Sequence, residues 1–380
     1  MTRVRPTLLK LHRWLGIGLA VLLLVQGLTG AALAFRHELD ALLHPALKVS
    51  PAPPRAPVQA LIDTVRAAHP DHDFNRVDFP GEADRAAVFT LARKTDDQAR
   101  LVAVDPYANR IVRDGTVGDW PTEWLFHLHE ELLAGETGHT IVGIEGLALL
   151  FLAITGPIVW WPGIARLRKS LRVVVGRGAD PLWRTLHRTG GAIAAAFLLI
   201  SATTGALMVW KVPLRDALAP YGTIKKPAPK VAEQPGRAML AADRLIARAR
   251  ADHGDTPLQQ LRFPGGHGRV VTVYLDSDPG TRPGGSKQIW YDAYSGDELG
   301  RYVTGSIPAG NAFIDWLYTI HTGAVAGTPG RLLVLLAGLS LAALSGSGVW
   351  LWWSRTARLR ARRGSRAAPE TTAGAGATSS

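Results

Sequence analysis

Four long apolar runs constrain this chain of 380 residues more than any other feature of its sequence. They lie at 15–35, 141–161, 190–210 and 332–353, and each has about 21 residues. A helix rises about 1.5 Å per residue, so each run is long enough to cross a hydrocarbon core of about 30 Å. Because a single apolar segment in lipid can satisfy its backbone only as a helix, we predict four transmembrane helices. Tryptophans at the ends of the runs support this prediction, since indole rings favour the membrane interface: Trp160, Trp161, Trp210, Trp350, Trp352 and Trp353.

A cleaved secretory signal is the alternative interpretation of the first run. Residues 1–34 begin basic, continue apolar and finish with Ala32-Leu33-Ala34, which resembles a cleavage site. The run is longer than the apolar core of an ordinary signal, and a related segment recurs inside the chain. We therefore expect a retained helix.

The distribution of charge predicts the orientation. Three short segments, 1–13, 162–188 and 354–380, together hold 17 basic and two acidic residues. The longer segments differ, since 36–138 holds 11 basic and 17 acidic residues and 211–330 holds 14 and 11. Because cytoplasmic loops carry an excess of Lys and Arg, we expect a multi-pass protein with both termini cytoplasmic and two domains of about 100 residues facing outward. The net charge of +12 then reflects topology, and we discard nucleic-acid binding, which needs a basic folded domain.

The chain contains no cysteine. This excludes disulfide bonds, cysteine-ligated iron–sulfur clusters and covalent haem attachment through a C-x-x-C-H motif. Any redox metal must therefore be held by other ligands.

The second half of the chain repeats the first. The motif Leu-His-Arg occurs at 11–13 and at 186–188, an offset of 175 residues, and the same offset places Thr29-Gly30-Ala31 on Thr204-Gly205-Ala206. The segments that precede the second and fourth runs align at an offset of 192, with WLFHLHEELLAGETG (124–138) on WLYTIHTGAVAGTPG (316–330). The outer segments repeat too, each with a helical pattern (60–70, 239–254) followed by alternating strand patterns (77–89 with 261–274, 104–114 with 290–301).

We therefore predict an α-helical membrane protein, in which a four-helix transmembrane bundle with internal two-fold duplication carries two extracytoplasmic α/β domains. Equal orientation of the halves implies a pseudo-two-fold axis along the membrane normal. Proline-rich stretches at 51–54 and 225–229 are the predicted linkers. The predicted segments are a cytoplasmic leader (1–13), the first span (14–36), the first outer domain (37–121), an interfacial helix and turn (122–138), the second span (139–162), a cytoplasmic loop (163–185), the third span (186–211), the second outer domain (212–313), a second interfacial helix and turn (314–330), the fourth span (331–354) and a basic, disordered cytoplasmic tail (355–380).

Two pairs of histidines occupy matching positions in the repeat. His12 matches His187 at the cytoplasmic end, and His129 matches His321 at the outer end. Under the two-fold axis, the members of each pair lie at equal depth and can ligate one metal from both faces. A b-type haem suits this arrangement, because it needs axial imidazoles and helix bundles build cofactor sites from inward side chains. Zinc suits it less, because a structural zinc site requires four ligands.

Small and acidic residues in the runs extend the candidate site. Glycines of the first and third runs give a flat macrocycle room beside the backbone, although close helix packing explains each of them equally well. Glu145, about one turn into the second run, is a candidate to bond a ligand imidazole or, through a proton, a haem propionate. The glycines are Gly16, Gly18, Gly27, Gly30, Gly190, Gly191 and Gly205, of which we assign Gly16, Gly30, Gly191 and Gly205 to cofactor binding.

The other histidines are weaker candidates. His37 has no matching histidine, His139 matches Arg331 as an interfacial anchor, and His127 points about 200° away from His129 on one helix. Replacement of an assigned ligand by one of these three stays open. Five more are expected to be solvated in the outer segments: His44, His69, His72, His253 and His267.

The four runs resemble a known family. In order, LHRxxG…TGA, LHxxLLAGETG…TGxxxWWP, LHRTGG…TGALMVW and IHTGAVAGTPGRLL…GxWLWW are similar to the spans of PepSY-associated transmembrane proteins, over about residues 8–355. The outer repeats resemble PepSY domains, in which a helix precedes a short antiparallel sheet. The best understood branch of this family consists of inner-membrane ferric-siderophore reductases with two b-type haems. The resemblance therefore implies one haem between His12 and His187 and another between His129 and His321.

This resemblance implies a multi-pass oxidoreductase of a bacterial inner membrane, with two periplasmic domains, that transfers electrons outward to a ferric siderophore or another ferric chelate, for iron release. The cytoplasmic segments are too short for a flavin or nicotinamide domain and contain no G-x-G-x-x-G, so a separate cytoplasmic reductant or a membrane quinol must supply electrons. Four aromatic residues of the outer domains are expected to pack those domains, with contact to a chelate as the alternative: Trp120, Trp124, Trp290 and Tyr291.

Two further functions compete with this interpretation. PepSY modules also occur in protease propeptides, so the chain is alternatively a membrane-anchored protein that binds or inhibits extracytoplasmic peptidases. An anchor would not need duplicated histidines at the membrane interface. A transporter of the chelate is disfavoured, because four helices without intramembrane polar clusters offer little pathway.

Overall fold

The chain divides into two compact units, which are described here one at a time. The bundle unit comprises Met1–Leu28, Ala148–Leu199 and Ala337–Ser380, and the sheet unit comprises Thr29–Leu147 and Ile200–Leu336. The predicted linker at 225–229 lies outside the described residues. The computed structural model describes residues 4–93, 99–222, 231–263, 269–276, 286–303 and 308–367.

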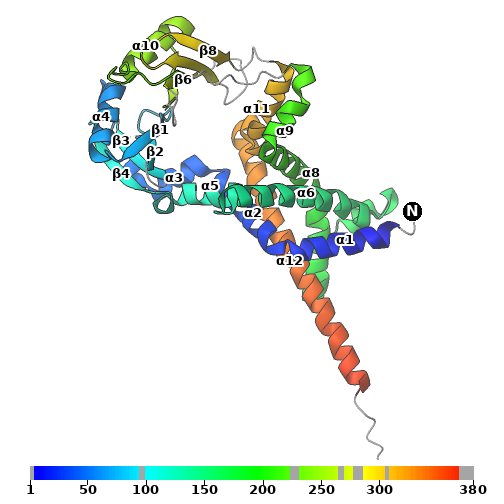
Figure 1. Cartoon of the computed structure of the whole chain (residues 1–380). Coiled ribbons are helices and arrows are strands. Elements are labelled where there is room, and N and C mark those ends of the chain that lie inside the picture. The colour runs from blue at the N-terminus through cyan, green and yellow to red at the C-terminus, as the bar shows by residue number, and fades with distance from the viewer. Residues whose placement is uncertain are drawn as a thin grey trace, which may run out of the picture. The chain divides into compact units, whose positions relative to one another are not determined.

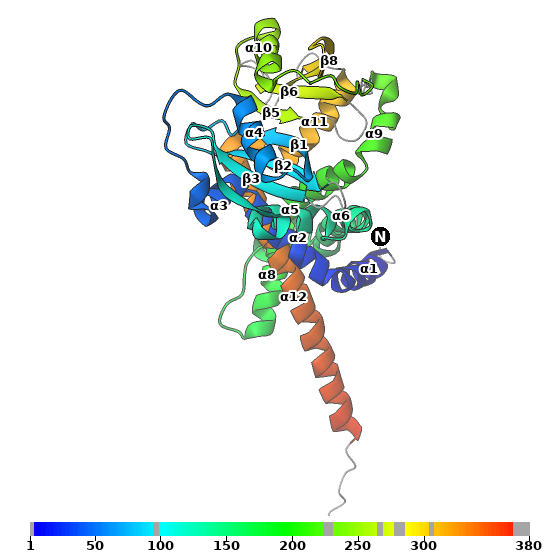
Figure 2. The same ribbon diagram turned by 60° about the vertical axis from the view of Figure 1, so that its left-hand side comes forward.

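Long apolar helices make the chain a membrane protein. In the described ranges, three helices are long and apolar enough to cross a membrane, namely α6 (Gly135–Trp160), α8 (Ala179–Val209) and α12 (Gly327–Ala367) (Figures 1 and 2). A fourth span results if α1 (Val4–Gly18) and α2 (Ala20–Leu33) are counted together.

The first predicted span, 14–36, is bent. Helices α1 and α2 meet at Leu19 with an angle of 68° between them. Gly18 ends α1, and glycine is a frequent site of helix kinks because it lacks a Cβ. Hydrophobicity continues through the bend, so the apolar pattern alone does not reveal it. Helix α1 begins at Val4, so His12 of the predicted leader lies within a helix.

Two other helices extend beyond their predicted ends. Helix α8 begins at Ala179 instead of residue 186, and α12 continues to Ala367. The prediction of a disordered tail from residue 355 is therefore wrong as far as residue 367, because Arg, Ala and Leu are strong helix formers. Residues 368–380 lie outside the described part of the chain. Shorter elements connect the long helices: α3 (Arg36–Leu43), η1 (Pro45–Leu47), η2 (Val117–Asp119), α5 (Pro121–Glu131), η3 (Ile164–Arg166), α7 (Leu167–Ser170), α9 (Lys211–Ala217), η4 (Ala219–Tyr221), α11 (Ala309–His321) and η5 (Ala324–Ala326).

The sheet unit contains one antiparallel sheet built from two similar runs, each a helix followed by four strands. The order of strands is β4-β3-β2-β1-β5-β6-β7-β8, so the second run mirrors the first across the β1–β5 pair. The first run comprises α4 (Val58–Ala68), β1 (His72–Asp78), β2 (Ala87–Arg93), β3 (Ala99–Asp105) and β4 (Arg110–Thr116). The second comprises α10 (Ala242–His253), β5 (Leu258–Arg262), β6 (Val270–Asp276), β7 (Ser286–Asp292) and β8 (Glu298–Val303).

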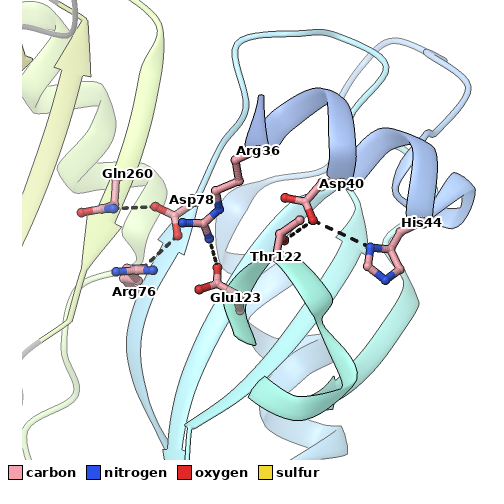
Figure 3. A network of polar contacts seen from close by, with 8 residues as sticks. All are labelled: Arg36, Asp40, His44, Arg76, Asp78, Thr122, Glu123 and Gln260. Carbon is pink, nitrogen blue, oxygen red and sulfur yellow. Dashed lines mark hydrogen bonds and ion pairs between the residues drawn. The ribbon is translucent and has the colours of Figure 1, made fainter. Parts of the chain in front are cut away.

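Strands β1 and β5 join the two predicted outer domains. Val77 lies opposite Leu261, and both are fully buried. Asp78 accepts hydrogen bonds from Arg76 and from Gln260 of the other strand (Figure 3). Each strand would otherwise present an unpaired sheet edge, so the pairing removes two edges. Alternating polarity predicts a strand without showing its partner, which is why the sequence predicts two separate domains.

One face of this sheet carries a hydrophobic core shared by both runs. Helix α4 contributes Leu61 and Val65, and α10 contributes Leu245 and Ala249, all at most 1% exposed (Figure 1). The opposite face of the first run has a smaller core, because side chains of β3 alternate between the two faces. Its buried members are Leu47, Val49, Ala86, Leu101, Ala103 and Trp120.

The bundle unit is packed through small and branched apolar side chains. Gly27 shows how closely its helices approach, since a Cβ on Gly27 would lie 2.6 Å from the carbonyl oxygen of Gly338. This supports the packing explanation for Gly27, because small residues let membrane helices come together. The buried cluster comprises Leu23, Leu152, Ala153, Ala194, Leu198, Ala337 and Leu341.

Candidate functional site

The outer pair of predicted ligands, His129 and His321, lies in the sheet unit with its two rings close together. Their ring centroids are 6.3 Å apart, and the ring planes make an angle of 49°. His129 is in the last turn of α5, and His321 is the last residue of α11. Two segments 192 residues apart thus place matching imidazoles side by side, as the repeat predicts.

Polar contacts to α3 hold α5 in place. Arg36 of α3 forms an ion pair with Glu123, and the hydroxyl of Thr122 donates a hydrogen bond to Asp40 (Figure 3). His44, buried beside Trp120, lies 3.8 Å from the same Asp40 carboxylate. These contacts fix the first turn of α5, whose last turn carries His129.

Tight junctions follow both ligand-bearing helices. A Cβ on Gly138 would lie 1.7 Å from the carbonyl oxygen of Glu131, and one on Gly330 would lie 2.1 Å from that of Gly323. Only glycine fits such approaches, which gives a physical reason for the repeated glycine at these matching positions. Leu132 also adopts a left-handed conformation, with φ of 51°, directly after α5. Strained residues of this kind occur where surrounding structure imposes the conformation, often near functional sites.

The inner pair, His12 and His187, lines a single cavity in the bundle unit. The cavity has a volume of about 830 Å³. Its walls include Gly16, Gly191 and Trp160. This volume is in the range of small-molecule and cofactor pockets, about 300–1,000 Å³.

Arginines give this cavity a cationic lining. The Nε atoms of Arg13 and Arg188 are buried and, among the described residues, have no hydrogen-bond partner. The indole Nε1 of Trp160 is in the same condition. Buried donors without partners are rare, so these three groups suit a ligand that brings acceptor atoms. Arg184, Arg355 and Arg358 line the cavity as well.

Each of the four histidines has its Nδ1 at hydrogen-bond distance from a hydroxyl. For the outer pair, Thr29 lies 2.9 Å from His129 and Thr204 lies 3.0 Å from His321. For the inner pair, Thr155 lies 2.9 Å from His12 and Ser347 lies 2.8 Å from His187. The sequence pattern did not predict a role for these hydroxyls, although Thr29 and Thr204 belong to the aligned Thr-Gly-Ala motifs.

The glycines assigned to cofactor binding fall into two groups. Gly16 and Gly191 line the cavity of the inner pair, as expected for residues that make room for a ligand. Gly30 and Gly205 instead face the outer histidine rings, where an added Cβ would lie 3.0 Å and 3.1 Å from Cε1 of His129 and His321. Gly18 and Gly190 face no atom of another element within 4 Å.

Glu145 is 3% exposed in α6, and neither carboxylate oxygen has a hydrogen-bond partner in the described residues. The suggested bond to an imidazole is therefore not formed. A bond from Glu145 to a haem propionate stays a prediction.

The weaker histidine candidates lie outside both pairs. His127 points to Glu131, with Nδ1 2.8 Å from the carboxylate, and His37 is exposed on α3. The expectation that the outer histidines are solvated is wrong for His44 and His72, which are 6% and 8% exposed. Both belong to the sheet unit, and the sequence pattern does not reveal that their side chains are buried there. His267 lies outside the described residues.

Arg331, the match of His139, anchors the start of α12 to α3. Its Nε donates to the carbonyl oxygen of Ala34 at 2.7 Å, and its Nη1 donates to Glu38 at 2.7 Å. The guanidinium also lies over the ring of Phe35 at 4.4 Å. Hydrogen bonding by Arg331 lowers the pKa of Glu38, so the pair stays ionised at neutral pH.

The aromatic residues of the outer domains mostly pack the fold. Trp120, Trp290 and Tyr291 are buried, while Trp124 is 40% exposed. Burial raises the pKa of Tyr291 to about 12, so its hydroxyl is neutral at physiological pH. The first three therefore contribute to packing, which leaves Trp124 as an accessible aromatic group.

A sequence profile described as the PepSY-associated TM region matches residues 9–355, which is most of the chain. No curated protein matches it significantly.

Proposed function

Since the chain belongs to the PepSY-associated transmembrane family, we propose that it binds two b-type haems and transfers electrons across a bacterial inner membrane to a ferric chelate outside. The observation that carries the proposal is the pairing of the four repeated histidines. Two of them have ring centroids 6.3 Å apart, and the other two line one cavity.

The outer pair would suit a metal held by two imidazoles. Two imidazoles that each bonded one metal at about 2.0–2.1 Å would have ring centroids about 6 Å apart. The observed separation of 6.3 Å agrees with that arrangement. Burial lowers the pKa of His321, which keeps its imidazole neutral, and the neutral form is the one that ligates metals.

The inner pair fits haem through the cavity that surrounds it. Apolar walls and glycines suit a porphyrin, and a b-type haem carries carboxylates that need cationic or hydrogen-bonding partners. The unpartnered Nε atoms of Arg13 and Arg188 are suited to hold these carboxylates, because Arg binds carboxylates through charge-assisted hydrogen bonds.

The proposed architecture is a parallel duplication with four membrane spans. Helices α1 and α2 together form the first span, and the two runs of the sheet arise from the two halves. The basic flanks then lie in the cytoplasm, with His12 and His187 toward that side, and the two predicted outer segments lie in the periplasm.

The protein residues hold and insulate the redox groups. Haem supplies reversible one-electron exchange between ferric and ferrous iron, and the chain sets its ligands and surroundings. His12, His187, His129 and His321 provide imidazoles, and the apolar helices exclude water. A membrane quinol is one donor class, since its oxidation releases two electrons and two protons and thereby reduces two ferric ions. Ferrous iron binds oxygen-rich chelators more weakly than ferric iron, so each transferred electron releases one metal ion.

The test is the haem content and redox activity of the full chain. Protein purified in detergent from haem-replete cells should hold two haems and give the difference spectrum of bis-histidine b-type haem. After dithionite reduction and removal of excess reductant, addition of a ferric siderophore should reoxidise both haems and yield two ferrous ions per chain, trapped by a ferrous-specific dye. A folded, colourless protein would refute the proposal and favour a peptidase-binding anchor.

Replacement of Arg188 by glutamine tests the cavity. A hydrogen bond to a charged group contributes about 1.5–3 kcal/mol, so Arg188→Gln should weaken haem binding at the inner site at least about tenfold. The measurement is haem transfer to an excess of apomyoglobin. Arg177→Gln is the control, because Arg177 is exposed in the loop before α8. Equal rates of haem loss from both variants would contradict a role of Arg188 in holding haem.

A further inference from the structure

A dipeptide of Ser or Thr followed by Gly contacts every one of the four paired histidines. Each dipeptide lies on an apolar helix (α2, α6, α8 or α12), and the histidine that it contacts lies on another helix. The hydroxyl contacts Nδ1 and the glycine faces Cε1 of the same ring. The combinations are Thr29-Gly30 with His129, Thr155-Gly156 with His12, Thr204-Gly205 with His321 and Ser347-Gly348 with His187.

The direction of the hydrogen bond follows from the helix that carries the hydroxyl. Thr155 donates its proton to the carbonyl oxygen of Phe151 at 2.7 Å, and Thr204 donates to that of Ile200 at 2.8 Å. Ser347 likewise donates to the carbonyl oxygen of Leu344, at 3.1 Å. A hydroxyl has one proton, so these three hydroxyls are left to accept from the imidazole, which places the hydrogen on Nδ1; Thr29 is assigned the same role because it matches Thr204 in the repeat. The lone pair of the neutral ring is then on Nε2.

The glycine admits the edge of the ring beside this hydrogen bond. An added Cβ would lie 3.0 Å from His129 at Gly30 and 3.1 Å from His321 at Gly205. At Gly156 and Gly348 the corresponding separations from His12 and His187 are 3.4 and 3.5 Å. A side chain in place of the glycine would therefore displace the outer rings more than the inner rings.

We propose that these four Ser/Thr-Gly dipeptides are positioning residues that fix the tautomer and the rotation of each histidine, so that Nε2 is presented as the ligating nitrogen. The part of this proposal that concerns ligation rests on the proposed function, whereas the tautomer is a property of the chain without haem. The repeat supports it independently, because Thr29-Gly30 matches Thr204-Gly205 at one offset and Thr155-Gly156 matches Ser347-Gly348 at the other.

Loss of one hydroxyl should weaken one haem site only. Groups that orient a ligating histidine change metal affinity about 10–100-fold when removed. We expect Thr155→Val to accelerate loss of the inner haem by about that factor and to raise its reduction potential, because a ring that no longer donates at Nδ1 is a weaker electron donor. Thr155→Ser keeps the hydroxyl and should retain the wild-type potential. The outer haem, titrated in the same sample, is an internal reference.

Substitution of the glycines gives a graded second test. Gly30→Ala and Gly205→Ala should perturb the outer haem, seen as a changed low-spin electron paramagnetic resonance signal, while Gly156→Ala and Gly348→Ala should perturb the inner haem less. Gly190→Ala and Gly346→Ala are matched controls on α8 and α12, since no atom of another element lies within 4 Å of either position. Equal effects of control and test substitutions would refute the role of the glycines.

Nitrogen-15 spectra of histidine side chains in haem-free protein separate this proposal from the proposed function. The expected result is the Nδ1-protonated tautomer for His12, lost in Thr155→Val and retained in Thr155→Ser. A wild-type protein with this tautomer that binds no haem would refute the proposed function alone. A protein that binds two haems, whose potentials and tautomers do not respond to Thr155→Val or Ser347→Ala, would refute the positioning role alone.

Discussion

Replacement of His129 by alanine is expected to reduce the haem content from two to one per chain. The ring centroids of His129 and His321 are 6.3 Å apart, so loss of either imidazole would leave the proposed outer haem with one histidine to hold it. His321→Ala should therefore have the same effect. The inner pair should be unaffected, because His12 and His187 line a separate cavity within the bundle unit. Haem per chain and the number of steps in a redox titration measure the loss.

His127→Ala is the matched control for this experiment. His127 lies on the same helix as His129, but its Nδ1 lies 2.8 Å from the carboxylate of Glu131. The variant should keep two haems and both redox steps. If His127→Ala removes a haem and His129→Ala does not, the assignment of the outer ligand is wrong. Retention of two haems in both His129→Ala and His321→Ala would refute the pair.

The histidine pairs are predictable from the sequence because the chain repeats itself. A single histidine at a membrane interface carries little information, whereas His12 and His187 at matching positions indicate a shared site. The same repeat contains the Thr-Gly and Ser-Gly dipeptides, but their meaning depends on which helices are neighbours. Thr155 is far from His12 in sequence, and only the packing of α6 against α1 shows that the two side chains meet. The position of Arg13 and Arg188 in the cavity wall was not predicted for a different reason. Both lie in basic flanks, and the orientation of the chain in the membrane already explained their charge.

The bend between α1 and α2 and the joined sheet were not predictable, for two physical reasons. Apolar composition measures whether a segment suits lipid, and it is unchanged by the bend at Leu19. Alternating polarity shows that β1 and β5 each have one buried face, but it contains no information about the partner at the strand edge. Long-range pairing between Val77 and Leu261 is a property of the whole fold.

Replacement of Leu261 by alanine is expected to destabilise both runs of the sheet together. Leu261 is fully buried on β5, beside Val77 of β1 and Val273 of β6. Removal of a buried leucine side chain costs about 2–5 kcal/mol in the free energy of unfolding. Because α4 and α10 share one hydrophobic core, the loss should reach strands of the first run. Hydrogen exchange measured by mass spectrometry should show faster exchange in β1–β3 as well as in β5–β7.

Leu299→Ala provides the control, because this leucine on β8 is 37% exposed and its removal should leave exchange in both runs nearly unchanged. Two domains that fold independently would give a different result for Leu261→Ala, with faster exchange confined to β5–β8. That outcome would mean that the β1–β5 pairing contributes little to stability. Coupled loss of protection would instead mean that the two runs of the sheet form one cooperative unit. Cooperativity would also affect the histidines. Helix α5 follows the edge strand β4, and α11 follows the opposite edge strand β8. A sheet that folds as one body would therefore hold His129 and His321 at a fixed separation.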